Sequence, residues 1–152
     1  MREGNETPET PAAEKNVYDQ KTAEAEFDRY CEANDLDCDI GNMNDEEKES
    51  FEVIKRRFIK ACKQGRVKVD GTNLKYIVSS FSPPGFAGKE ITIARSGGQS
   101  FMGMDNYKDT QSVHKTNGFL SAMTGQETSF FAKIDGKDWM FFRDIANLFL
   151  AG

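Results

Sequence analysis

Carboxylates at alternate positions form the sharpest chemical pattern in this sequence. Asp35, Asp37 and Asp39 are spaced two residues apart, and Glu46 stands at the twelfth position of the same segment. Oxygen ligands at positions 1, 3, 5 and 12 of a loop suit Ca²⁺, but such a loop needs glycine at its sixth position for a sharp turn. Ile40 stands there. The segment is therefore either a Ca²⁺ loop or a solvated acidic linker between two helices.

The cysteines and the single histidine give no comparable pattern. Cys31, Cys38, Cys62 and His114 do not have the four-ligand spacing of a zinc site. Their spacing leaves open a Cys–His catalytic pair, but structural thiols and a surface histidine explain it more simply. There is no Ser-His-Asp pattern, and the glycines at 97–98 lack the lysine of a phosphate-binding loop. We therefore expect a protein that is not an enzyme, with no catalytic residue, no metal and no cofactor.

Charge is divided unevenly along the 152 residues. Residues 1–50 hold 16 acidic and 5 basic side chains, whereas the rest of the chain is mildly basic. A dense basic run follows, at Lys55, Arg56, Arg57, Lys60, Lys63, Arg66 and Lys68. We interpret it as a solvated helix face, or a docking surface for the acidic N-terminal part, opposite Phe51, Ile54 and Phe58. A nucleic-acid surface is the alternative, but no aromatic residue interleaves the bases on that helix face, so we do not expect one.

The N-terminal part reads as a tail followed by two helices. Residues 1–15 have almost no large apolar side chain, which predicts a disordered acidic tail. Apolar spacing predicts a helical region over 16–65, with helices at 17–33 and 45–64 and an acidic loop at 34–44. Asn44 and Glu47 resemble a capping box at the start of the second helix, and Gly65 is placed to end it.

The remainder reads as a small sheet followed by helices. Short apolar runs at 67–69 and 74–78 flank Asp70-Gly71 and predict a hairpin, and 90–94 supplies a third strand that a Gly-Gly turn closes. Helices are predicted at 107–124, 129–133 and 137–150. The fold class is α+β, with a small three-stranded antiparallel sheet packed by C-terminal helices and preceded by two N-terminal helices.

The last predicted helix is apolar on nearly all sides. Trp139, Phe142, Ile145 and Phe149 lie on one stripe. Such a helix needs two neighbours, so these side chains are either anchors for a partner or core under the sheet. We select the four as candidate partner-binding residues. Asp135 and Asp138 precede the stripe, and we interpret both as caps of this helix rather than as catalytic acids.

Two segments in the C-terminal part carry a resemblance. Residues 119–125 read FLSAMTG and residues 131–138 read FAKIDGKD. This order resembles a signature of the tail assembly chaperones of tailed bacteriophages and prophages, in which a leucine and small residues precede Thr-Gly, and Lys-Leu-Asp-x-x-Asp precedes a terminal helix. Ile134 stands where leucine is usual. The resemblance covers a chaperone-like domain at about 66–152.

The resemblance implies a non-catalytic protein that coats the tape measure protein and keeps it soluble until tail tube subunits assemble around it. The expected partners are the tape measure protein and the tail tube protein, and self-association into a homo-oligomer stays open. No stretch approaches the length of a membrane helix and no secretory signal is evident, so we expect the cytoplasm of a bacterial host. The alternative function is a Ca²⁺-responsive or regulatory adaptor that uses residues 35–46.

Overall fold

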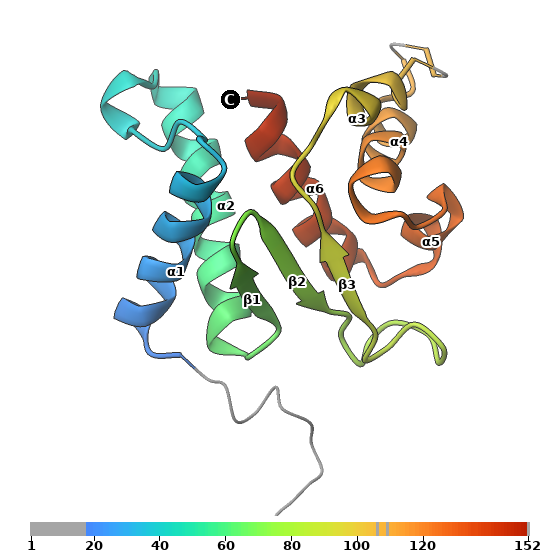
Figure 1. Ribbon diagram of the computed structural model, residues 1–152, viewed down its shortest axis with the longest axis horizontal. Coiled ribbons are helices and arrows are strands. Elements are labelled where there is room, and N and C mark those ends of the chain that lie inside the picture. Colours follow the sequence, from blue (N-terminus) through green and yellow to red (C-terminus); the bar gives the residue numbers. More distant parts are fainter. Residues whose placement is uncertain (1–17, 106, 109, 152) are drawn as a thin grey trace, which may run out of the picture.

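The computed structural model describes residues 18–151 apart from 106 and 109, and the expected disordered tail lies outside this part. Figure 1 shows two N-terminal helices, a central sheet and a group of C-terminal helices, which confirms the predicted α+β fold. The elements are α1 (Gln20–Ala33), η2 (Ile40–Asn42), α2 (Asp45–Lys63), β1 (Val67–Asp70), β2 (Asn73–Ile77), β3 (Glu90–Ile93), α3 (Gly98–Met102), α4 (Ser112–Thr124), α5 (Thr128–Lys133) and α6 (Gly136–Ala151).

Helix α2 has the predicted ends. The Asn44 side chain accepts a hydrogen bond from the Glu47 N–H at 2.8 Å, and the Glu47 carboxylate accepts one from the Asn44 N–H at 2.9 Å. This reciprocal pair is the predicted capping box. At the other end, Gly65 follows the helix with a φ of 77°, a left-handed conformation that suits glycine. Local sequence signals therefore set both boundaries.

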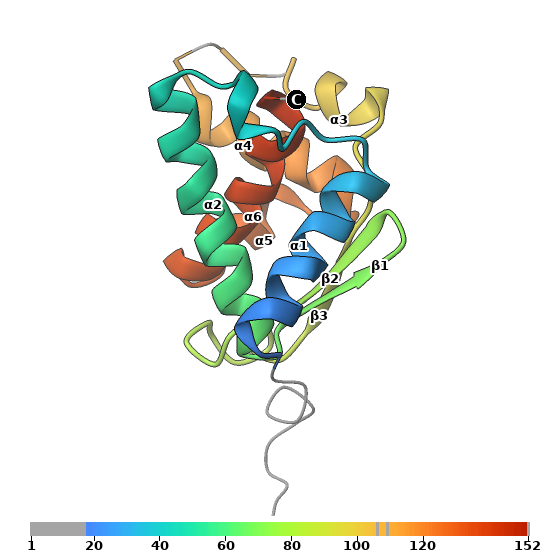
Figure 2. The same ribbon diagram turned by 90° about the vertical axis from the view of Figure 1, so that its left-hand side faces the viewer.

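The sheet is a meander of order β1-β2-β3, antiparallel throughout. The predicted hairpin turns at Gly71, which has a φ of 62°, and the register pairs Val69 with Leu74 and Tyr76 with Ile91. Buried and exposed residues alternate along β1 and β3, as expected for a sheet covered on one face. Figure 2 shows the helices gathered on that face.

One hydrophobic core joins the N-terminal helices to the rest of the described chain. Phe58 of α2 contacts Tyr30 of α1 and Phe141 of α6, with ring centroids 5.9 and 6.2 Å apart. Phe141 in turn stacks on Tyr76 of the sheet at 4.3 Å. Residues 16–65, predicted as a helical region, and residues 66–152, predicted as a chaperone-like domain, therefore contribute to the same core where they are described.

The segment between β3 and α4 differs from its prediction. Residues 98–102, expected to follow a closing turn, form the short helix α3, and α4 begins at Ser112 rather than near 107. The cause is tertiary packing that no local pattern reveals. An added Cβ at Gly118 would lie 2.5 Å from the Gly103 carbonyl oxygen, so the two backbones touch. Phe101 also packs on Phe119, with ring centroids 5.1 Å apart.

No helix within the described residues is both long enough and apolar enough to cross a membrane.

Candidate functional site

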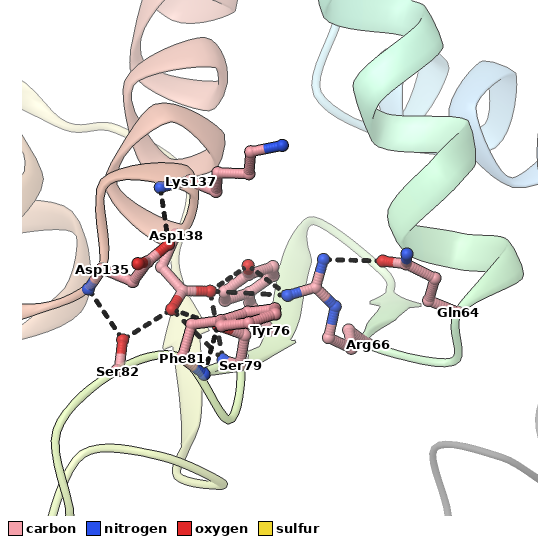
Figure 3. A network of polar contacts seen from close by, with 9 residues as sticks. All are labelled: Gln64, Arg66, Tyr76, Ser79, Phe81, Ser82, Asp135, Lys137 and Asp138. Carbon is pink, nitrogen blue, oxygen red and sulfur yellow. Dashed lines mark hydrogen bonds and ion pairs between the residues drawn. The ribbon is translucent and has the colours of Figure 1, made fainter.

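A fully buried carboxylate, Asp138, is the centre of the largest polar network in the described chain. Asp138 is 0% exposed, and its neighbours Tyr76 and Ser82 are 1% and 4% exposed. Its Oδ1 accepts from the Tyr76 hydroxyl at 2.5 Å, and its Oδ2 accepts from the Ser82 hydroxyl at 2.6 Å and the Ser79 hydroxyl at 2.8 Å. The Ser79 N–H also donates to Oδ1 at 3.1 Å. Figure 3 shows these groups converging on one side chain.

Three separate elements deliver these groups. Tyr76 comes from β2, Ser79 and Ser82 from the connection that follows it, and Asp138 from the first turn of α6. Arg66, immediately before β1, contacts Asp138 at 3.5 Å and the Tyr76 hydroxyl at 3.1 Å. The network therefore pins the start of α6 to the sheet and to the β2–β3 connection.

The interpretation of Asp138 as a helix cap is wrong. Asp135 is the cap, because its Oδ2 accepts a hydrogen bond from the Lys137 N–H at 2.9 Å and its carbonyl accepts the Trp139 N–H at 3.0 Å. Asp138, three residues later, turns away from the helix end toward Ser79 and Ser82. Its partners are more than 50 residues distant in the chain, so spacing along the sequence gives no signal of the network.

The groups of this network satisfy one another's hydrogen bonds. Burial raises the pKa of Tyr76, although the nearby Arg66 guanidinium opposes this shift. The phenol therefore stays protonated and donates to Asp138. The Ser82 hydroxyl donates to Asp138 and accepts a hydrogen bond from the Asp135 N–H at 2.8 Å, so it is satisfied both as donor and as acceptor. A buried carboxylate with a full set of donors rigidifies the elements that supply them.

A second buried carboxylate corrects the interpretation of the basic run. Asp144 on α6 accepts two hydrogen bonds from the Arg57 guanidinium at 2.9 and 3.0 Å. Burial raises the pKa of Asp144, and the Arg57 guanidinium opposes that rise. Arg57 and Arg66 therefore point toward buried acids, not to a solvated face. A fork-shaped guanidinium suits this paired geometry.

Other members of the basic run do face solvent, as predicted. Arg56, Lys60, Lys63 and Lys68 are exposed. The first three line a shallow groove between α1 and α2, together with Glu24, Glu52 and several other residues. Two acids and four bases line that groove, so it is not a surface of one charge sign, which a nucleic-acid backbone favours.

The acidic segment 35–46 has a simple structural explanation. Leu36 and Cys38 are half-buried against the core, whereas Asp35, Asp37 and Asp39 are exposed. Exposed and half-buried residues alternate from Asp35 to Asp39, which places the three acids on the solvent side of the segment.

Local hydrogen bonds already occupy two of these carboxylates. Asp37 accepts the Asp39 N–H at 3.1 Å, and Asp39 accepts the Gly41 N–H at 2.9 Å. Among the described residues, no group of three or more His, Cys, Asp or Glu side chains is placed to hold a metal ion. The Ca²⁺-responsive adaptor therefore stays a prediction that no preformed ligand group in the described residues supports.

The four candidate partner-binding residues lie mostly in the core. Phe142 and Ile145 are fully buried and Phe149 is nearly so. Trp139 is only partly buried. Its indole N–H donates to the Asn117 side chain of α4 at 2.7 Å. Of the four, Trp139 alone offers surface to a partner while α6 stays in place.

Exposed apolar side chains outside α6 are the feature that sequence reasoning did not select. Phe101 and Met102 on α3 are 48% and 66% exposed, and Val113 on α4 is 53% exposed. We call these three the α3–α4 surface. Phe81, in the β2–β3 connection, is 81% exposed. No sequence pattern predicts α3, and without that helix Phe101 and Met102 lie in a predicted loop.

No family model, no curated protein and no solved structure matches the chain.

The two segments that carry the resemblance have structural tasks in this fold. Gly125 has a φ of 74° and ends α4 in the left-handed conformation. The Thr124 hydroxyl donates to the Leu120 carbonyl at 2.8 Å and accepts the Gln126 N–H at 3.1 Å. These residues fix the end of α4, and Asp138 fixes the start of α6 against the sheet. The signature positions therefore specify architecture.

Proposed function

We propose that this chain is a non-catalytic assembly chaperone of tailed bacteriophages or prophages, which binds the tape measure protein and keeps it soluble. The observation that carries the proposal is the α3–α4 surface. Phe101, Met102 and Val113 expose apolar side chains from two helices that pack together. Exposed apolar groups gathered on neighbouring elements favour protein binding.

The resemblance supports the choice of partner class by analogy. Its signature residues occupy turns, caps and buried positions, so the likeness concerns fold first, and function follows from fold only as an association. The binding surface must come from side chains that the fold leaves accessible. This requirement favours the α3–α4 surface over the buried part of α6.

A tape measure protein is a long amphipathic helix that aggregates when its apolar stripe meets water. Such a stripe can lie against an apolar surface, as in helix-in-groove recognition. Trp139 borders α4 through its hydrogen bond to Asn117, and we include it in the proposed contact. Phe142, Ile145 and Phe149 would reach a partner only if α6 left the sheet, so in this proposal they hold α6 in position.

A pull-down from cells that assemble phage tails tests this proposal. Tagged wild-type chain is expected to retain one very long, helix-rich protein, identified by mass spectrometry as the tape measure protein. The double variant Met102→Gln with Val113→Thr keeps side-chain size and should lose most of it, because each apolar side chain buried on binding contributes about 1.5–3 kcal/mol.

Phe81→Ser is the matched control. It removes a larger exposed apolar side chain from the β2–β3 connection, which lies at the other end of the molecule from α3 in Figure 1. Retention should match wild type. Equal loss of the tape measure protein with both variants would indicate nonspecific apolar binding. Its retention by the double variant would rule out the α3–α4 surface as the binding site.

A further inference from the structure

The chain reverses direction at the end of α1 and returns over Cys31. The Asp35 N–H donates to the Glu32 carbonyl at 3.2 Å, and the Leu36 N–H donates to the Cys31 carbonyl at 2.9 Å. Asp35 has a φ of 54°. This pair of bonds around a left-handed residue is a Schellman turn. The turn fixes the path of the next residues relative to the last turn of α1.

Two thiols meet as a result of this turn. Beyond it, Leu36 and Cys38 face inward while the intervening Asp37 is exposed. Cys38 is thereby brought beside Cys31, close enough for each thiol to shift the pKa of the other. Both also line one shallow surface depression, so small solutes can approach the pair from solvent. Cys31 is buried and Cys38 is half-buried, which makes Cys38 the more accessible thiol.

We propose that Cys31 and Cys38 are a redox pair that closes reversibly into an intramolecular disulfide in the presence of a peroxide. In the first step the Cys38 thiolate attacks one peroxide oxygen, the O–O bond breaks, and a sulfenic acid forms at Cys38 while hydroxide leaves and takes up a proton. In the second step the Cys31 sulfur attacks the Cys38 sulfur, the S–O bond breaks, and water leaves. Two thiols are oxidised and one hydrogen peroxide becomes two waters.

The directions of the pKa shifts assign the same roles to the two cysteines. The neighbouring Cys31 thiol lowers the pKa of Cys38, against the opposing effects of burial and Asp28. The neighbouring Cys38, together with burial, raises the pKa of Cys31. Cys38 is therefore the attacking thiolate and Cys31 the thiol that resolves it. Burial raises the pKa of Cys62 to about 12, which leaves that thiol unreactive.

Peptide mapping of the intact reduced protein after peroxide treatment tests the pair. Native protein is exposed to hydrogen peroxide, alkylated and digested with trypsin. Cleavage after Arg29 and Lys48 leaves both cysteines on one peptide. We expect that peptide to be lighter by two hydrogen atoms and to escape alkylation until a dithiol reductant is added. Closing so short a loop should also raise Tm by about 5 °C.

Two variants control for other thiol chemistry. Cys62→Ala should form the same linked peptide and show the same rise in Tm on oxidation. Cys38→Ser should form neither. Disulfide-linked dimers through Cys38, sulfinic acid at Cys38 with Cys31 still free, or equal alkylation of both thiols after peroxide would each overturn the proposal.

Discussion

The Asp138 network predicts a large loss of stability from the replacement of a single oxygen. In Asp138→Asn, an amide nitrogen takes the place of one carboxylate oxygen and retains almost the same shape. Oδ2 accepts from the hydroxyls of Ser79 and Ser82, and an NH₂ group there cannot accept from either. Hydrogen bonds to a charged acceptor contribute about 1.5–3 kcal/mol each. Since the neutral amide is easier to bury, we expect a net loss of about 3 kcal/mol in the free energy of unfolding.

Urea unfolding followed by circular dichroism measures this loss. The slope of unfolding free energy against urea concentration should stay unchanged, which would show that both proteins expose the same surface on unfolding. The matched control is Asp135→Asn, three residues earlier. Asparagine caps helices about as well as aspartate, so this variant should stay within about 0.5 kcal/mol of wild type. If the two variants lose equal stability, or if Asp138→Asn loses less than about 1 kcal/mol, Asp138 does not hold α6 in the way described.

Three further changes follow from the same contacts. Arg57→Met leaves Asp144 buried without its main partner, and this should lower the free energy of unfolding by about 3 kcal/mol at pH 7. Because burial already raises the pKa of Asp144, the loss should shrink as the pH falls and the carboxyl is protonated. Unfolding measured at several pH values tests both expectations. Gly118→Ala places a Cβ 2.5 Å from a backbone oxygen and should lower the free energy of unfolding by about 2 kcal/mol. The control Gly136→Ala meets no atom within 4 Å and should not destabilise the protein. Thermal melts of both variants test the difference. Phe149→Ala should lower the free energy of unfolding by about 3–5 kcal/mol in denaturant titrations, so partner loss in that variant alone would reflect unfolding.

The sequence predicts those parts of the fold whose causes are local. The capping box of Asn44 and Glu47, the hairpin turn at Gly71 and the helix ends at Gly65 and Gly125 all depend on residues a few positions apart. Their hydrogen bonds close within one turn, so residue type and spacing are sufficient. The sheet face was predictable for the same reason, because its alternation has a period of two residues.

The features that the sequence could not predict depend on distant contacts. Asp138 and Asp135 look alike as acids before an apolar helix, and only distant partners, Tyr76 on β2 and the serines that follow it, give Asp138 its buried role. Arg57 looks like its basic neighbours until α6 brings Asp144 beside it.

The alternate acids at 35–39 show how one pattern can have two causes. Their spacing fits a Ca²⁺ loop and equally fits an extended segment with Leu36 and Cys38 facing inward. The identity of the inward residues distinguishes the two, because a metal loop directs its alternate oxygens toward a shared centre rather than outward into solvent.

Co-expression of the chain with the tape measure protein from the same genome tests the central claim most directly. The measurement is the fraction of tape measure protein that remains soluble after high-speed centrifugation, with wild type, the Met102→Gln and Val113→Thr double variant, and Phe81→Ser. The chaperone account predicts that wild type and Phe81→Ser keep most of it soluble and that the double variant, although folded, does not. A tape measure protein that is equally insoluble with and without the wild-type chain would contradict the account.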